Sequence, residues 1–211
     1  MSKYISVYRL TIFGILLFFC LSLRKAWALH DRYPDPPIRT CRYGESIGLG
    51  SYRMTFSGWE WGDGSLVKEK FPDYILVYPR EDGLAEDARV GLICFTVTKT
   101  SPGGDILDFT AMGFSSGAWG NQFDLELFYL LNPELNSPFL DLPDGGTQEV
   151  ILPLILLESQ FTEEQWEEID SREFYVNIQY YPEHIRFLCP CGGRQFGRLC
   201  VYRPIQRSDS S

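Results

Sequence analysis

The chain has 211 residues and carries 28 acidic against 19 basic side chains, a formal net charge of −9. Residues 1–28 hold four of the basic residues and no acidic ones, so the rest of the chain carries −13. A surface this acidic repels phosphate backbones and anionic lipids, which argues against nucleic-acid-binding and membrane-surface proteins. The remaining length suits one domain with a substantial core.

The first 28 residues have the pattern of a secretory signal. Lys3 and Arg9 precede an uncharged apolar run, Leu10 to Leu23, and Ala26-Trp27-Ala28 places small residues at the positions that a signal peptidase reads. The run has 14 residues, fewer than the roughly 20 that a membrane-spanning helix needs. We therefore expect a signal peptide over residues 1–28 and a secreted, periplasmic or otherwise extracytoplasmic protein.

The alternative is a leader that is not cleaved. Arg24 and Lys25 follow the apolar run, and positive charge on that side slows translocation. An uncleaved leader would make the protein a membrane-anchored subunit of a larger assembly. We expect contact with a membrane only in that case.

Residues 29–40 contain three prolines and several charges, so they predict an extended arm. Beyond the arm we expect a single β-rich domain over residues 41–204 and a disordered tail over residues 205–211.

Short apolar or alternating runs, bounded by turn residues, follow one another along this domain. They lie at 52–56, 74–78, 90–97, 106–112, 123–127, 150–157 and 174–180. Pro153 interrupts one of them and favours an edge strand or a bulged strand there. The pattern predicts a mainly β fold, an antiparallel β-sandwich or barrel.

One short helix is predicted within this background, over about residues 162–170. Thr162 can cap the first free amides, and Gln165 can return the bond to the cap. Phe161 can pack on Trp166 and fix the direction in which the chain enters the helix. A strand with Phe174, Val176 and Ile178 on one face follows directly.

The segment 161–186 resembles the C-terminal half of a chordin-type CHRD domain. That family ends with a threonine-started helix, a Tyr-Val-Asn-Val/Ile strand, a proline and a Glu-Ile-Arg-Gly turn. The matching residues are Phe161, Thr162, Gln165, Ile169, Phe174, Tyr175-Val176-Asn177-Ile178, Pro182 and Ile185-Arg186. The sequence departs from the pattern at Gln179-Tyr180 and at His184, and it lacks the family's upstream His-x-His element. The resemblance implies an extracellular β-rich module that binds partners, and it offers no catalytic residues.

Five cysteines remain after the leader, and four of them are disulfide candidates: Cys41, Cys189, Cys191 and Cys200. If strands over 184–189 and 198–203 form a hairpin, Cys189 or Cys191 lies opposite Cys200, and the other member of the pair could bond to Cys41. Cys94 lies in an apolar run and is expected to stay a buried free thiol.

Two alternatives stay open for the clustered cysteines. One is a zinc site made by Cys189, Cys191 and Cys200 with Cys41 or His184, although single-residue Cys-x-Cys spacing is unusual for zinc. The other is a redox dithiol at Cys189 and Cys191. We predict neither a bound metal nor a cofactor.

Gly113-Phe114-Ser115-Ser116-Gly117 fits the Gly-x-Ser-x-Gly pattern of a serine nucleophile, with His184 as the one downstream base. A small serine hydrolase using Ser115 and His184 is therefore an alternative function. The sequence around Ser115 lacks the strand-to-helix context of such enzymes, and a glycine turn explains the pattern equally well.

Trp59 and Trp61 lie on one side of an extended segment, with Asp63 nearby. Two indoles in this arrangement suit stacking on sugar rings or anchoring a protein, and Asp63 can add hydrogen bonds or a calcium ligand. The alternative, and the more common outcome for tryptophan, is that at least one indole packs in the core. We therefore expect a non-enzymatic binding or structural module that recognises a protein or glycan partner through surface aromatic residues.

Overall fold

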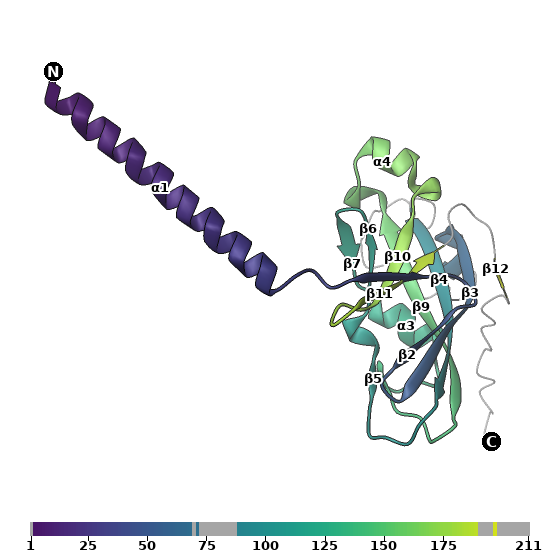
Figure 1. The fold of residues 1–211 in the computed structure, drawn as a ribbon. Helices are drawn as coiled ribbons and strands as arrows, with labels where there is room; N and C mark the ends of the chain where they lie inside the picture. The colour runs from purple at the N-terminus through teal and green to yellow at the C-terminus, as the bar shows by residue number, and fades with distance from the viewer. Residues whose placement is uncertain (1, 69–70, 72–87, 190–195, 198–211) are drawn as a thin grey trace, which may run out of the picture. The chain divides into compact units, whose positions relative to one another are not determined.

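The computed structural model describes residues 2–68, 71, 88–189 and 196–197 (Figure 1). The chain divides into two compact units, Met1–Pro37 and Ile38–Ser211.

The first unit is the helix α1, Ser2–Arg32. Its segment Ile12–Arg32 has 21 residues and a mean hydropathy of 1.8, so it is long and apolar enough to cross a membrane, a test that a signal sequence also passes. The predicted apolar leader is thus a helix. The predicted arm over 29–40 is partly wrong, because α1 continues to Arg32 and strand β1 begins at Ile38.

The second unit is mainly β, as predicted, and most of its strands form two sheets. Sheet A has the order β1 (Ile38–Cys41), β11 (His184–Cys189), β10 (Phe174–Gln179), β6 (Gly113–Ser116) and β7 (Trp119–Asn121). Sheet B has the order β12 (Phe196–Gly197), β3 (Tyr52–Asp63), β4 (Ala88–Lys99) and β9 (Thr147–Leu157), and β2 (Ser46–Leu49) also pairs with β3.

The remaining elements are short. They are β5 (Leu107–Asp108) paired with β8 (Phe139–Leu140), the helices α2 (Ser65–Lys68), α3 (Leu125–Leu131) and α4 (Glu163–Glu167), and the 3-10 turns η1 (Phe109–Ala111), η2 (Glu158–Gln160) and η3 (Ile169–Ser171). Neighbouring strands are antiparallel except for β1, which runs parallel to β11.

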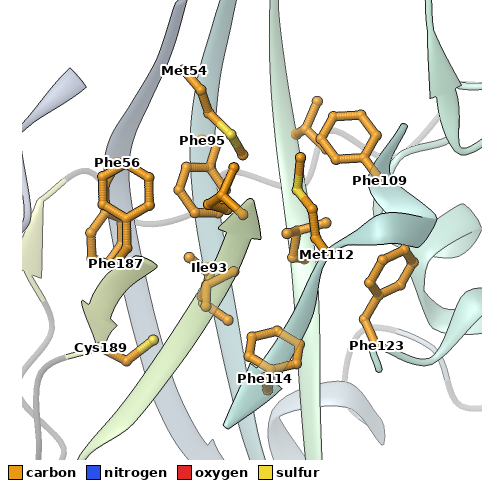
Figure 2. Packing of buried hydrophobic residues seen from close by; sticks show 14 of the residues in the cluster. Met54, Phe56, Ile93, Phe95, Phe109, Met112, Phe114, Phe123, Phe187 and Cys189 are labelled. Carbon is orange, nitrogen blue, oxygen red and sulfur yellow. The ribbon is translucent and has the colours of Figure 1, made fainter. Parts of the chain in front are cut away.

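Sheets A and B share one hydrophobic core, which makes the fold a β-sandwich (Figure 2). Phe56 of β3 and Phe95 of β4 lie against Phe187 of β11, with ring centroids 5.8 Å and 5.3 Å apart. Because strand side chains alternate between faces, these inward positions fix which residues of each strand point outward.

Strand β4 is buried on both faces. Ile93 and Phe95 belong to the core between the sheets, whereas Leu92 and Cys94 belong to a second cluster with Leu127 of α3. This double burial explains why the sequence reads as a continuous apolar run here rather than an alternating one.

The predicted capped helix is confirmed as α4. The side-chain oxygen of Thr162 accepts from the Gln165 amide at 3.3 Å, and Gln165 Oε1 accepts from the Thr162 amide at 3.2 Å. The rings of Phe161 and Trp166 are 5.9 Å apart. The strand predicted after the helix is β10, with Phe174, Val176 and Ile178 buried.

The strand predicted over residues 123–127 is wrong, since this segment begins helix α3. The Asp124 carboxylate accepts from the Leu127 amide at 2.7 Å and caps the helix. Leu127 and Leu131, four positions apart, then reach the second cluster together. The apolar residues at 123, 125 and 127 alternate as in a strand, but Asp124 between them is the helix cap and Leu127 belongs to the buried face of the helix.

Among the strands that the structure describes, β9 lies at the edge of sheet B, in agreement with the first of the two predictions for Pro153. Its outer side is covered at several points. The Asn132 side chain accepts from the Ile151 amide and donates to the Ile151 carbonyl, both at 2.8 Å. Pro153, two residues on, has no N–H to leave unpaired. Near the end of the strand, Gln160 Oε1 accepts from the Leu157 amide at 3.2 Å.

At the C-terminal end, the first strand of the predicted hairpin is confirmed as β11. The second, predicted over 198–203, lies outside the described residues, as do the run at 74–78 and the tail. Phe196–Gly197 forms β12, which pairs with β3 in sheet B rather than with β11.

Asn132→Ala should destabilise the fold by about 2–4 kcal/mol, because it removes buried hydrogen bonds and leaves the Ile151 backbone groups without partners. Urea unfolding followed by circular dichroism measures the change. Asn136→Ala is the matched control at an exposed asparagine, and equal stability of the two variants would contradict the role given to Asn132.

Candidate functional site

The outer face of sheet A is shaped by the alternation of β11. Ile185, Phe187 and Cys189 are buried in the core, so His184 and Arg186 point to the opposite face. On that face, Arg186 is in register with Asn177 of β10, and Asn177 is in register with Gly113 of β6.

Two glycines hollow this face into a groove. Gly113 is in register with Asn177, and Gly120 of β7 is in register with Ser115 of β6, so both places lack a side chain. The resulting groove has a volume of about 760 Å³. Its described polar lining consists of Ser115, Asn121, Gln122, Asn177, Tyr180, His184 and Arg186.

Asn177 is the central polar residue of the groove and is only 2% exposed. Its Nδ2 donates to Ser115 Oγ at 2.9 Å, and its Oδ1 lies 2.9 Å from His184 Nε2. Because an amide oxygen can only accept, the imidazole donates here and carries its proton on Nε2. These bonds join three strands into one fixed polar surface.

His184 is held in its neutral form. Burial, and secondly the positive charge of Arg186, lower the pKa of His184 below its ordinary value of 6.5. The ring also stacks on Tyr180, with centroids 5.1 Å apart. The neutral imidazole leaves Nδ1 as an acceptor beside the groove.

Ser115 and His184, the predicted catalytic pair, lie in the same groove but do not contact each other as nucleophile and base. The amide of Asn177 lies between them, and His184 Nε2 donates to that amide. Ser115 is inside strand β6, which turns back into β7 rather than entering a helix. The groove therefore lacks the contact through which a base activates a serine.

The structure contradicts an exposed tryptophan pair. Trp59 is 3% exposed and packs in the core, stacked on Trp61 with centroids 5.6 Å apart. Trp61 is partly buried, and its Nε1 donates to Asp170 at 2.9 Å. Gly91 opposite Trp61 provides the space, since a Cβ there would lie 2.6 Å from the Trp59 ring. The two indoles pack the end of the core.

Asp63 is exposed, and its carboxylate serves the local chain. It accepts from the backbone amide of Ser65 at 2.9 Å and from the Ser65 hydroxyl. These two bonds lower the pKa of Asp63. The carboxylate thus holds the turn into α2.

The cysteines also differ from expectation. Cys41 and Cys189 are buried and carry thiols, so the predicted disulfides through them are not formed. Cys41 is in register with Phe187, and Cys189 lies two residues further along, a diagonal of about 7–8 Å between Cα atoms that exceeds disulfide reach. Burial raises the pKa of the Cys41 thiol.

Cys94 was expected to be a free thiol, and this is wrong because it is disulfide-bonded. Its partner lies outside the described residues, as do the candidates Cys191 and Cys200. His184 and Cys189 point to opposite faces of β11, so the two cannot bind one zinc ion together.

Sequence reasoning missed Asn177, Arg186 and the two groove glycines as site residues. The alternation over residues 174–180 places Asn177 on the face opposite Phe174 and Val176, but it does not mark Asn177 as a site residue. An asparagine in the middle of an otherwise apolar and aromatic strand is unfavourable for sheet formation, and that mismatch was the available signal.

The lowered pKa of His184 predicts a pH-dependent stability. The folded chain binds the proton less readily than the unfolded chain, so this contribution is fully present above pH 6.5 and is lost as the pH falls through the lowered folded pKa. Thermal unfolding between pH 7.5 and pH 5 should show a steeper loss for the natural protein than for His184→Gln. Parallel curves for the two proteins would contradict the assignment.

None of the curated proteins matches the chain. A solved structure of an uncharacterized β-sandwich protein from Clostridium difficile aligns over 74% of this chain and 97% of its own, with 9% identity and a TM-score of 0.39. A family model described as a domain of unknown function, DUF5028, matches residues 73–185, which is more than half of the chain. The chain therefore belongs to the DUF5028 family.

Proposed function

We propose that the chain is an extracytoplasmic, non-enzymatic binding module that recognises a glycan through the groove on the outer face of sheet A. One observation carries the proposal: the buried amide of Asn177, held by Ser115 and His184, forms a fixed polar floor in an open hollow. Sugars present many hydroxyl groups, and preformed amide, imidazole and hydroxyl groups can bind them with little ordering cost.

An aromatic ring at the groove supports the same ligand class. Tyr180 lines the groove, is 53% exposed and is held by stacking on His184. An aromatic face of this kind can pack on the apolar face of a sugar ring while its hydroxyl stays in water. We therefore assign the contact with the sugar ring to Tyr180 instead of Trp59 and Trp61.

Binding is favoured over hydrolysis by the hydrogen bonds within the groove. Asn177 occupies the position between Ser115 and His184 that proton transfer would have to cross. An amide neither gives up nor takes up a proton at neutral pH. The CHRD-like segment, which includes Asn177, adds the resemblance of this region to extracellular modules that bind partners.

Export is supported by the apolar helix α1 and by the disulfide at Cys94, because disulfides persist in oxidising compartments outside the cytosol. A chain expressed with its own leader in an exporting host should begin at Leu29, as judged by intact mass. An intact leader in the membrane fraction would support the anchored alternative. A full-length chain in the cytosol would contradict export.

Filling the groove tests the binding site. The wild-type chain should bind at least one class on an array of neutral and acidic oligosaccharides. Gly120→Leu should weaken that binding at least tenfold, because the new side chain enters the groove. A Cβ at Gly120 meets only the Phe114 carbonyl, at 3.5 Å, so the variant should fold.

Gly48→Leu is the matched control. Gly48 is an exposed strand glycine of β2 in the other sheet, with nothing within 4 Å of an added Cβ. Circular dichroism and the melting temperature confirm that both variants are folded. Absence of any glycan binding by the wild-type chain, or unchanged binding by Gly120→Leu, would overturn the proposal.

A further inference from the structure

The charge of the groove is opposite to that of the molecule. The chain has an excess of nine negative charges, yet the described lining of the groove contains no aspartate or glutamate. Arg186 is the one permanently charged side chain in that lining, and the lowered pKa of His184 keeps the imidazole neutral at pH 7. The described lining of the groove therefore carries one positive charge, that of Arg186, within a chain that is acidic as a whole.

Arg186 is held ready for a ligand. Its Nε donates to Thr40 Oγ1 at 3.1 Å, and its guanidinium carbon lies 3.8 Å from the centre of the Tyr175 ring. These two contacts come from the strands on either side, β1 and β10. A guanidinium fixed in this way loses less freedom on binding than a mobile side chain.

The terminal nitrogens of Arg186 are left for another partner. In the part of the chain that the structure describes, the ion pairs are Arg89 with Asp170 and Lys99 with Asp141, and Arg186 forms none. An arginine fork matches the oxygen pair of a carboxylate, which it can bind through two parallel N–H bonds. The other polar groups of the described lining, among them Asn121 and Gln122, lie beside this cation and can bond to sugar hydroxyl groups.

We infer that the groove selects an acidic glycan, and that Arg186 binds the carboxylate of a uronic acid unit. The inference rests on the proposed glycan binding and adds the chemical class of the sugar. One fixed cation suits one carboxylate. A densely sulfated glycan would need several cations and would be repelled by the surrounding acidic surface.

Matched pairs of ligands test the inference. The full chain is titrated calorimetrically at pH 7 with tetrasaccharides of galacturonate, of glucuronate and of hyaluronan. Each acid is compared with its own methyl ester, which keeps every hydroxyl and loses the charge. A fully sulfated maltotetraose, which carries no carboxylate, is the sulfated probe. We expect at least one acid to bind ten times more tightly than its ester and more tightly than the sulfated probe.

Substitution of Arg186 gives the second arm. Arg186→Gln should abolish the preference, so that the variant binds the acid no more tightly than it binds the ester. Arg186→Lys keeps the charge but not the fork, and should retain only part of the preference. Arg53→Gln, at an exposed arginine of β3 in the other sheet, should change nothing.

The outcomes separate the two proposals. Equal affinity for acid and ester, a preference that survives in a folded Arg186→Gln variant, or tighter binding of the sulfated probe would overturn the inference and leave glycan binding in place. Binding of none of these sugars, together with an empty oligosaccharide array, would overturn both. Unfolding curves of each variant distinguish lost recognition from lost structure.

Discussion

The packing of Phe187 between the two sheets is the constraint on which the outer surface depends. Its ring lies against Phe56 and Phe95, and this fixes the rotation of β11 about its own axis. Side chains alternate along a strand, so the burial of Phe187 places His184 and Arg186 on the opposite face. A slip of one residue in β11 would bury both polar groups and expose the core residues, at a cost that no local hydrogen bond could offset.

The groove follows from this fixed register together with two absent side chains. All five strands of sheet A take part: β11 supplies His184 and Arg186, β1 supports Arg186, β10 supplies Asn177, and β6 and β7 supply the glycines Gly113 and Gly120. Of these residues only Asn177 is unusual in its own segment, as a buried amide in an apolar and aromatic strand. The polar surface exists only because the sheet aligns them, and the Asn177 amide then connects β6, β10 and β11 through hydrogen bonds.

Short sequence patterns predicted local structure such as a capped helix well. They predicted poorly the surfaces that form when distant strands come together. The capping pair Thr162 and Gln165 acts within one turn, so its geometry follows from four consecutive residues, and α4 formed as predicted. The alternation at 123–127 failed because a capping aspartate outweighed a short strand-like period. Trp59 was predicted on the surface because sequence spacing gives the side of a strand but not which side faces the core. The groove brings together residues far apart in the sequence, such as Gly113 of β6 and Arg186 of β11. One segment can therefore indicate Asn177 but not the assembled surface.

The covered edge of β9 has a consequence for the protein at high local concentration. An open edge strand presents a row of backbone donors and acceptors on which a second chain can add, and this is a common start of aggregation. Along β9, Asn132 already occupies both groups of Ile151, Pro153 offers no donor, and Gln160 takes the amide of Leu157. A neighbouring copy therefore finds no continuous ladder on this side of sheet B. Backbone pairing between two copies at this edge is therefore interrupted, and crowded molecules gain little by adding strand to strand there.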